Sequence, residues 1–179
     1  NLHRRIAAQR AASGEGPPHV VGLRYFNVFG PGEARKGKMA SMAHQLTHQI
    51  LESGRPRLFE HGEQARDQVA VEDVVACTIR GSEAGATPGV YNCGSGRATT
   101  FNEVADAVRA GLGVSESDAP TEYFEMPSSI RTFYQDFTRA DMSAARAGLG
   151  HEVAHEPREA IARYAALLAG AGAGEPASV

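Results

Sequence analysis

Polar side chains follow directly after the first apolar run of the chain. Val20 to Leu23 is typical of a buried strand, and the run Arg24-Tyr25-Phe26-Asn27-Val28-Phe29-Gly30-Pro31-Gly32 leads from it into a loop broken by two glycines and a proline. In open α/β sheets, ligands bind beyond the carboxyl ends of the strands. Asn27 could therefore bond a sugar or phosphate oxygen there, whereas stabilisation of the turn is the simpler role for a single asparagine.

Lysines come next, in the segment Lys36-Gly37-Lys38-Met39-Ala40-Ser41. A lysine can act as a general acid or base if burial or cationic neighbours bring its pKa near the working pH. A single lysine in a polar loop is more often a solvated charge. The segment by itself leaves both interpretations open.

An arginine and an aromatic residue further along the chain are physically suited to a nucleotide. Arg66 begins the block Arg66-Asp67-Gln68-Val69-Ala70-Val71-Glu72-Asp73-Val74, and a guanidinium can bond phosphate oxygens in a bidentate fork. Phe59, in Phe59-Glu60-His61-Gly62, could lie beside a base. The alternatives are an ion pair of Arg66 with Asp67 or Glu63 and, for the later Tyr134, a buried structural role.

The apolar spacing predicts the helices and strands that must position these residues. Thr100 and Glu103 form a capping box at the start of a helix. The segment 20–24 suits a parallel strand that is covered on both faces, and the alternation of strands and helices indicates the α/β fold class. We expect helices at 2–12, 39–53, 72–82 with Glu72 or Asp73 as the cap, 101–112, 139–147 and 157–168, and strands at 20–24, 56–60, 68–71, 89–93 and 121–124.

Composition narrows the class of protein. A chain of 179 residues with 42% hydrophobic and 22% charged residues is typical of a globular domain with a core. A net charge of -3 and a pI near 6.2 give no support to a nucleic-acid partner. No apolar run approaches the ~18 residues that span a bilayer, and no signal peptide is visible. We therefore expect no membrane partner and a cytoplasmic location.

Several residues with chemical potential are expected to be structural. Cys77 and Cys93 should be reduced core residues. The Gly94-Ser95-Gly96 loop lacks the third glycine of a dinucleotide-binding turn, and His44 should be at the surface or partly buried. The other histidines considered show no metal-ligand spacing, so we expect no metal site and surface positions for His3, His19, His48, His151 and His155.

Together, the blocks resemble the extended short-chain dehydrogenase/reductase family of nucleotide-sugar epimerases. Lys36-Gly37-x-Met39-Ala40-Ser41 and Tyr134-Gln135-x-Phe137-Thr138-x-Ala140-Asp141 resemble its ADP-glyceromanno-heptose 6-epimerases in particular. The resemblance implies the C-terminal part of a Rossmann-like fold with its smaller substrate-binding domain. Residues 1–35 would end the Rossmann domain, 36–169 would form the substrate-binding region interleaved with the last sheet strand (about 67–112), and 170–179 would be a disordered tail.

The same resemblance implies an isomerase that acts on an ADP-linked heptose. Oxidation at C6 of the heptose by NADP, with NAD as the alternative, and re-reduction from the other face would invert that centre, for lipopolysaccharide biosynthesis. Lys36 would be the catalytic acid/base group, and Val28 and Lys36 would contact the cofactor. The family often has serine at the position of Lys38 and, in some members, histidine at that of Gln45. The substrate-binding residues implied are Asn27, Lys38, Gln45, Phe59, Glu60, His61, Gly62, Arg66 and Tyr134.

Two parts that such an epimerase needs do not occur in this sequence. It contains no Gly-x-x-Gly-x-x-Gly turn and no Tyr-x-x-x-Lys pair, and it begins at Asn1 within a helical pattern. We therefore expect a fragment or a processed chain that cannot epimerise alone, and a homo-oligomer for the complete protein. The alternatives are a UDP- or GDP-sugar 4-epimerase or dehydratase, and a non-catalytic sugar-nucleotide-binding remnant.

Overall fold

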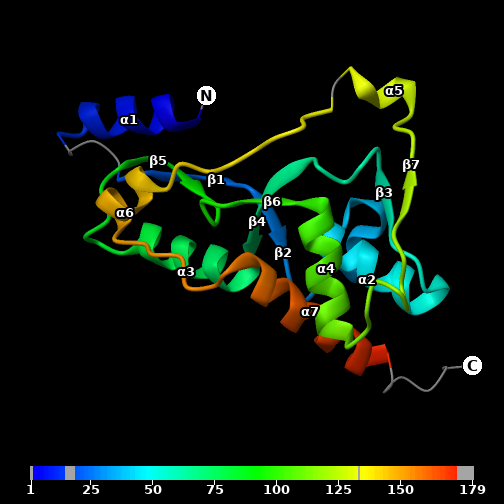
Figure 1. Ribbon diagram of the computed structural model, residues 1–179. Coiled ribbons are helices and arrows are strands. Elements are labelled where there is room, and N and C mark those ends of the chain that lie inside the picture. The colour runs from blue at the N-terminus through cyan, green and yellow to red at the C-terminus, as the bar shows by residue number, and fades with distance from the viewer. Residues whose placement is uncertain (1, 15–18, 133, 173–179) are drawn as a thin grey trace, which may run out of the picture.

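Short strands run through the middle of the molecule in this computed structural model, which describes residues 2–14, 19–132 and 134–172 (Figure 1). β1 (Val21–Tyr25) pairs in parallel with β5 (Gly89–Cys93). After Phe26 the chain continues as β2 (Asn27–Phe29), parallel to β4 (Ala65–Ala70). β4 also pairs antiparallel with β6 (Ala98–Thr100), and β3 (Arg57–Phe59) pairs in parallel with β7 (Glu122–Phe124). The predicted α/β class is confirmed.

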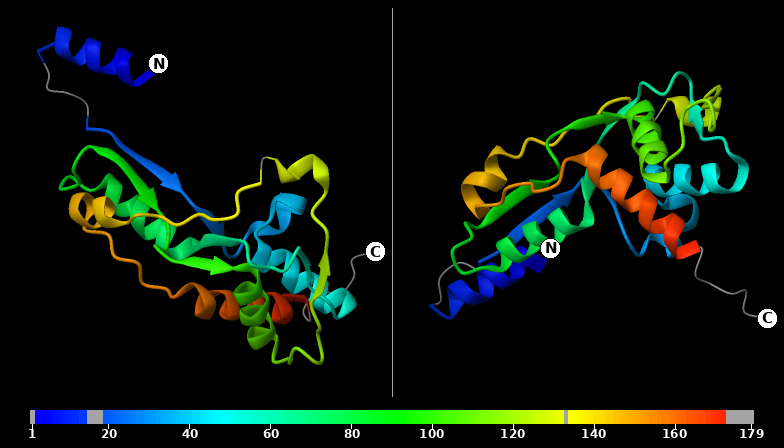
Figure 2. Two further views of the ribbon diagram at one scale, coloured as in Figure 1. Left: turned by 45° about the horizontal axis from the view of Figure 1, so that its top comes forward. Right: turned by 60° about the horizontal axis from the view of Figure 1, so that its bottom comes forward.

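Helices pack against these strands and build one end of the molecule. α3 packs against β1, β2 and β4, and α6 packs against β5. α2, α4 and α7 pack on one another at the end that carries β3 and β7, whereas α1 lies apart from the rest in Figure 1 and in the left view of Figure 2. The helices are α1 (Leu2–Ala12), the 3-10 helix η1 (Glu33–Met39), α2 (Met42–Ser53), α3 (Val71–Ser82), α4 (Phe101–Leu112), α5 (Ser128–Arg131), α6 (Ser143–Leu149) and α7 (Pro157–Gly172).

Two clusters of buried apolar side chains hold the elements together. Leu46 of α2, Val104 of α4 and Ile161 of α7 are fully buried in the larger cluster. The second cluster joins β4, β5, α3 and α6 and includes Cys77 and Cys93. Both cysteines are free, and burial raises the pKa of each thiol. The expectation that they are reduced core residues is confirmed.

Local signals predicted some helix starts correctly and others wrongly. Both hydrogen bonds of the Thr100–Glu103 capping box are present at the start of α4. The helix expected from residue 39 begins instead at Met42, because η1 occupies the preceding residues and the Ser41 hydroxyl caps α2 by accepting a hydrogen bond from the His44 N–H.

Two further helix boundaries differ because a carboxylate accepts hydrogen bonds from a distant segment of the chain. α3 begins at Val71, and Asp73 lies in its first turn, where its carboxylate accepts hydrogen bonds from the backbone N–H groups of Ala154 and His155. The helix expected at 139–147 begins only at Ser143, since the Ala140 N–H donates to Asp67 and the preceding residues run extended past β4. α7 extends to Gly172, past the helix end expected at residue 168 and into the segment expected to be a disordered tail, whose residues 173–179 lie outside the described residues.

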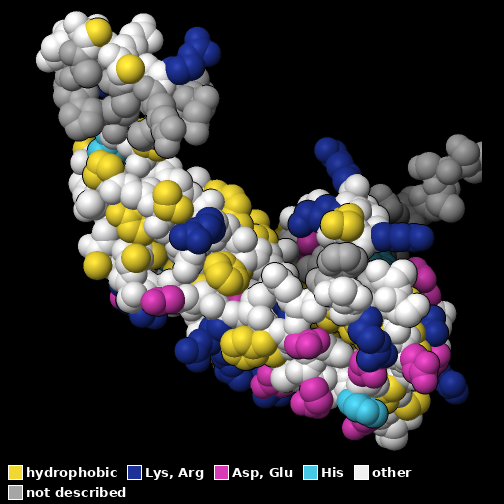
Figure 3. Space-filling view, turned by 90° about the horizontal axis from the view of Figure 1, so that it is seen from above, with side chains coloured by type: hydrophobic (Ala, Val, Ile, Leu, Met, Phe, Trp, Pro, Cys, Tyr) yellow, Lys and Arg dark blue, Asp and Glu magenta, His cyan; other side chains and the backbone are white. Residues whose placement is uncertain are grey.

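The prediction that the first strand is covered on both faces is wrong. The side chains of Tyr25 on β1 and Val90 on β5 are 53% and 62% exposed. Figure 3 shows hydrophobic side chains gathered along the arm of the molecule next to α1, where these two strands lie. The continuous apolar run therefore predicts the strand correctly, but it does not show that both faces of the strand are buried in this chain.

None of the helices among the described residues is long and apolar enough to cross a membrane.

The histidines correct another expectation. His151 was expected at the surface, but only 2% of it is exposed. His155 is partly buried, with its Nδ1 3.2 Å from the Asp73 carboxylate. Burial lowers the pKa of His151, and the neighbouring carboxylates of Asp73 and Glu152 oppose that shift. The expected surface positions are thus wrong for His151, while His19 is exposed and His48 is partly buried.

Candidate functional site

A pocket of about 230 Å³, which we call the strand pocket, lies between β2, β4 and the starts of α2 and α4. It brings together three of the predicted site residues, Asn27, Val28 and Arg66. Asn27 and Val28 were expected in a turn, but they belong to β2, because their backbone pairs with that of Gln68 and Val69 on β4. The residues that line the strand pocket are Asn27, Val28, Met39, Ala40, Ser41, Met42, Arg66, Gln68 and Phe101.

Two side-chain amides lie next to each other in the wall of this pocket. Asn27 and Gln68 are register neighbours on parallel strands, so their side chains point to the same face. Asn27 donates through Nδ2 to the backbone oxygen of Asp67 at 3.2 Å. Only 2% of Gln68 is exposed, and its Oε1 has no hydrogen-bond partner among the described residues. A buried amide without a partner is costly and calls for an explanation.

Arg66 extends the strand pocket toward a row of aromatic rings. Its guanidinium lies 5.1 Å from the centre of the Tyr134 ring, and Tyr134 meets Phe59 edge to face with 6.0 Å between ring centres. Phe59 in turn lies 4.7 Å from Phe124 of β7. Burial raises the pKa of Tyr134, although the charge of Arg66 acts in the other direction. Three predicted substrate residues from distant segments thus lie in one continuous surface.

The ion-pair alternative for Arg66 is not realised among the described residues. The Asp67 carboxylate points away and accepts hydrogen bonds from Ser95 and Gly96, while the Glu63 carboxylate accepts one from Asn102. Arg66 itself donates to the backbone oxygen of Ala65 at 3.2 Å. Its guanidinium is therefore placed by stacking on Tyr134 and by the backbone rather than by a carboxylate, which leaves its charge for a ligand.

Lys36 lies on η1 and does not line the strand pocket. Its Nζ is 2.9 Å from Oε1 of Glu33, and its side chain is 46% exposed whereas that of Glu33 is only 3% exposed. The same Glu33 oxygen accepts the Ser41 N–H at 3.1 Å, and Oε2 accepts the Ser41 hydroxyl at 2.6 Å. Because Ser41 lines the strand pocket, the Glu33 carboxylate connects Lys36 to the pocket wall.

Glu33 also faces polar groups of α2 and α7. Burial alone would raise the pKa of Glu33, but the hydrogen bonds from Ser41 and Lys36 outweigh it and hold the pKa below its ordinary value. Burial and the Glu33 charge raise the pKa of Tyr164 on α7. The Tyr164 hydroxyl lies 2.9 Å from Nδ1 of His44, and burial together with the neighbouring His48 lowers the pKa of His44. As expected, His44 is partly buried.

Gln45 and Lys38 belong to the same corner of the molecule. The Gln45 amide donates to the backbone oxygens of Ala40 at 2.7 Å and Lys38 at 3.3 Å, and so supports the segment that forms the pocket wall. Lys38 is exposed, and Gly37 before it has a φ of 52° that a side chain rarely adopts. Neither Gln45 nor Lys38 lines the strand pocket itself.

The remaining predicted residues form the turn after β3. Glu60 has a φ of 52° and its carboxylate is paired with Arg131, while its backbone N–H donates to Phe124. His61 is exposed, and Gly62 is buried against the side chain of Asn102. None of these three lines the strand pocket. They follow directly after Phe59, so they lie at the far end of the aromatic row.

The Gly94-Ser95-Gly96 loop has a structural role, as predicted. Both oxygens of the fully buried Asp67 accept hydrogen bonds from it, from Ser95 N–H at 2.6 Å, Ser95 Oγ at 2.8 Å and Gly96 N–H at 2.9 Å. The Ala140 N–H adds a fourth at 2.9 Å. One carboxylate next to Arg66 thus ties β4 to the loop after β5 and to the segment that follows Tyr134.

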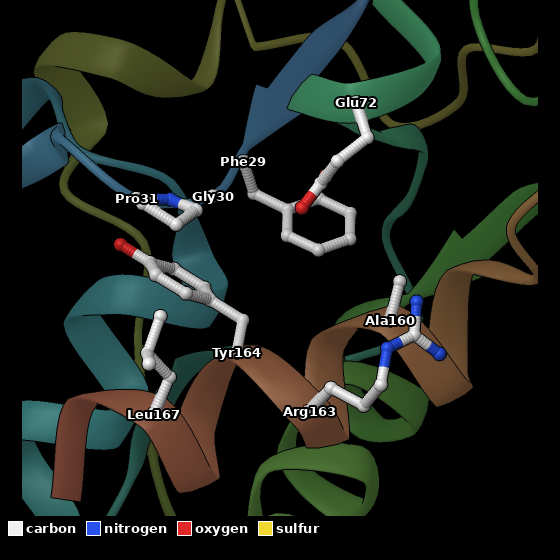
Figure 4. Close-up of a pocket in the computed structure, with 8 residues that line it drawn as sticks. All are labelled: Phe29, Gly30, Pro31, Glu72, Ala160, Arg163, Tyr164 and Leu167. Atoms are coloured by element: carbon white, nitrogen blue, oxygen red, sulfur yellow. The ribbon is translucent and has the colours of Figure 1, made fainter. Parts of the chain in front are cut away.

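A second cavity of about 190 Å³ lies beneath the loop after β2 (Figure 4). Its walls are mostly apolar, with Glu72 and Arg163 on different sides. In Figure 4 the Tyr164 ring crosses the cavity with its hydroxyl toward Pro31 and away from Arg163. No residue of this cavity was predicted to bind a ligand. Among the described residues, no group of three or more histidines, cysteines and carboxylates could hold a metal ion.

Glu33 and Asp67 organise the site. From the sequence, Glu33 was assigned no role and Asp67 was considered only as an ion-pair partner of Arg66. Both are buried carboxylates whose hydrogen-bond donors lie on other segments of the chain. The local sequence offers only a weak signal for either carboxylate, namely its closeness in sequence to a candidate cation, Lys36 for Glu33 and Arg66 for Asp67. The unpartnered amide of Gln68 was also missed, although Gln68 belongs to the Arg66 to Val74 block that the sequence analysis singled out.

Known proteins resemble this chain in both sequence and structure. Residues 5–94 match the NAD dependent epimerase/dehydratase family. The ADP-L-glycero-D-manno-heptose-6-epimerase of Alkalilimnicola ehrlichii is 46% identical over 134 residues, which are 72% of this chain and 41% of that protein. The crystal structure of the Helicobacter pylori ADP-L-glycero-D-manno-heptose-6-epimerase superimposes with a TM-score of 0.72 and 32% identity, over 87% of this chain and 46% of that one.

A third similar protein was solved with a UDP-linked sugar. MoeE5, solved in complex with UDP-glucuronic acid and NAD, superimposes with a TM-score of 0.72 and 27% identity, over 94% of this chain and 53% of that one. The chain thus spans about half the length of the relatives that it matches, or less. The family match covers half of the sequence, and the solved neighbours share the Rossmann-like arrangement of strands and helices. This chain belongs to the NAD dependent epimerase/dehydratase family.

Proposed function

We propose that this chain forms the substrate side of an ADP-glyceromanno-heptose 6-epimerase, which acts in lipopolysaccharide biosynthesis. The observation that carries the proposal is the strand pocket. It joins Asn27, Val28 and Arg66 and is linked to Lys36 through Glu33 and Ser41. The similarity to two heptose epimerases supports the choice of substrate, since the more similar of the two is 46% identical over the matched part.

The diphosphate and the nucleotide would lie along Arg66 and the aromatic row. The guanidinium can hold two phosphate oxygens at once, and Phe59 and Tyr134 offer ring faces and edges beside it. Glu60, His61 and Gly62 would close the far end. Gln45 would shape the sugar site through the backbone that it holds, and Lys38 would reach the substrate from the exposed side of η1.

Lys36 would exchange a proton with the sugar oxygen at the reacting carbon through its Nζ. In the structure Glu33 holds that ammonium group at 2.9 Å. The ion pair would have to loosen when the sugar arrives, and the exposed side chain of Lys36 leaves room for that movement. Before the sugar binds, Glu33 would keep the Lys36 ammonium group beside the pocket.

A nicotinamide cofactor would supply the hydride acceptor and donor of this reaction. The residues present fit only its edge, since Val28 offers an apolar wall in the strand pocket, whereas the sequence holds no glycine-rich turn for the diphosphate. We propose NADP, which the resemblance to heptose epimerases implies, with NAD as the alternative, because MoeE5 was solved with NAD. We also propose that residues 1–35 complete a Rossmann domain and that 36–169 form the substrate region.

Nucleotide binding by the chain tests this proposal. In calorimetric titrations, ADP-glucose should bind more tightly than UDP-glucose. Arg66→Ala should weaken ADP-glucose binding about ten-fold or more, because one charge-assisted contact is worth ~1.5–3 kcal/mol. Arg80→Ala is the control, since Arg80 is also a part-exposed arginine but lies on α3 beside Glu83, outside both the strand pocket and the row of aromatic rings. Tighter binding of UDP-glucose would favour a UDP-sugar epimerase or dehydratase instead.

A further inference from the structure

The unpartnered amide of Gln68 requires an explanation that packing does not give. Gln68 is 2% exposed and lies in the middle of β4, yet no hydrogen bond satisfies its Oε1 among the described residues. Leaving a buried polar group unpaired costs ~1–3 kcal/mol. An apolar side chain of the same length would fill this place in the core at lower cost. The glutamine therefore carries a stability penalty in the empty protein.

The surroundings of Gln68 indicate what would remove that penalty. Its side chain lines the strand pocket beside Asn27, its register neighbour, and Arg66 lies two residues earlier on the same face of the strand. Asn27 already donates to the backbone, and the Ser41 hydroxyl in the same wall is bound to Glu33. A terminal amide can turn to offer its oxygen or its NH₂ group, and a sugar hydroxyl can meet either one.

We propose that the side-chain amide of Gln68 hydrogen-bonds a hydroxyl of the glycosyl part of a sugar nucleotide and so helps this site to select the sugar. This inference rests on the proposed function, since it takes the strand pocket as the sugar site. A site whose buried polar groups are paired only by the ligand discriminates against compounds that lack the matching hydroxyl, because those groups then stay unpaired. Gln68 thus acts on binding of the sugar and not on that of the diphosphate.

Gln64 provides a matched control in the same region of the chain. It is also buried, with 8% exposed, and its Oε1 also lacks a partner, but it does not line the strand pocket. Methionine has nearly the shape of glutamine and no strong hydrogen-bonding group. Gln68→Met and Gln64→Met therefore remove the same chemistry at one place inside the pocket and one place outside it, and Gln68→Leu serves as a second apolar variant.

Binding of ADP-glucose and of ADP, measured with the whole 179-residue chain, tests the inference together with thermal unfolding. Gln68→Met should weaken ADP-glucose about ten-fold, leave ADP unchanged, and unfold at the same temperature or up to about 4 °C higher. Gln64→Met should leave both affinities unchanged. An unchanged affinity of Gln68→Met for ADP-glucose, an equal loss for ADP, or an equal loss in Gln64→Met would overturn the inference.

The remaining outcomes separate this inference from the proposed function. If the chain prefers UDP-glucose, and the Gln68 variants lose UDP-glucose but not UDP, Gln68 keeps its role while the heptose assignment fails. If ADP-glucose binds well and the Gln68 variants bind it equally well, the proposed function stands and the inference fails. Binding of neither sugar nucleotide would reject both. Unfolding of both Gln68→Met and Gln68→Leu would also overturn the inference, because the amide would then be structural.

Discussion

Asp67 is the residue whose loss should most disturb the framework of the site. Its carboxylate is fully buried and accepts four hydrogen bonds, two on each oxygen, from Ser95, Gly96 and Ala140. In Asp67→Asn one oxygen becomes an NH₂ group that cannot accept. The new amide would turn its NH₂ toward Ser95, whose hydroxyl can rotate to accept, so that at least one buried backbone N–H loses its acceptor.

The size of the effect follows from these contacts. A buried N–H without an acceptor costs ~1–3 kcal/mol, and the remaining hydrogen bonds lose their charge assistance, which roughly halves each of them. Relief from burying a charge offsets part of this loss. We expect a net destabilisation of about 3 kcal/mol, which corresponds to a fall of about 6–12 °C in the unfolding midpoint of a chain of this size.

Thermal unfolding followed by far-ultraviolet circular dichroism measures this fall. Asp118→Asn is the matched control, because the Asp118 carboxylate also accepts both the N–H and the hydroxyl of one serine, Ser115, but does so in exposed positions where water can replace it. We expect the midpoint of Asp118→Asn to stay close to that of the unchanged chain. A midpoint for Asp67→Asn that coincides with that of Asp118→Asn would refute the reasoning.

Two more predictions concern stability elsewhere in the chain. Because burial lowers the folded-state pKa of His151, the unfolded chain binds the proton more tightly, so stability should fall as the pH drops below about 6.5. In urea titrations between pH 7 and 5, His151→Gln should reduce this dependence, whereas His19→Gln, at an exposed position, should not. An equally steep dependence in His151→Gln would contradict this. Gly111→Ala should destabilise the folded chain by ~1–3 kcal/mol, because its new methyl group would clash with the backbone of Ala162 in α7. Gly85→Ala is the control, since a methyl group there meets nothing within 4 Å. Equal unfolding midpoints for the two variants would contradict this prediction.

Elements that depend on local chemistry could be predicted from the sequence. The capping box of Thr100 and Glu103 and the strand that ends at Cys93 are encoded by neighbouring residues, and the structure confirms both. η1 and the late start of α6 could not be predicted in this way. They depend on the Glu33 and Asp67 carboxylates, whose donors come from segments far along the chain or on the other side of a turn.

In the candidate site, too, some residues could be predicted from local sequence patterns and others could not. Arg66, Asn27 and Val28 could be selected because they belong to recognisable sequence blocks, although Asn27 and Val28 were expected in a turn, and the structure places all three around one pocket. The contact of Tyr134 with Arg66 depends on how the segment after α5 returns to β4, which no local pattern specifies. The position of Lys36 depends on its ion pair with Glu33, three residues earlier on η1, and on the hydrogen bonds that join Glu33 to Ser41 across the following turn.

Activity of a chimeric protein tests the central claim most directly. We would join this chain to the part of the Alkalilimnicola ehrlichii epimerase that it does not cover, and confirm that the chimera is folded and holds its cofactor. We would then follow the two C6 epimers of ADP-glyceromanno-heptose by NMR. We predict interconversion by the chimera, loss of at least 100-fold in Lys36→Ala, as is typical of removing a general acid or base, and no turnover by the chain alone. A folded, cofactor-bearing chimera that leaves the heptose unchanged, or turnover by the chain alone, would contradict this account.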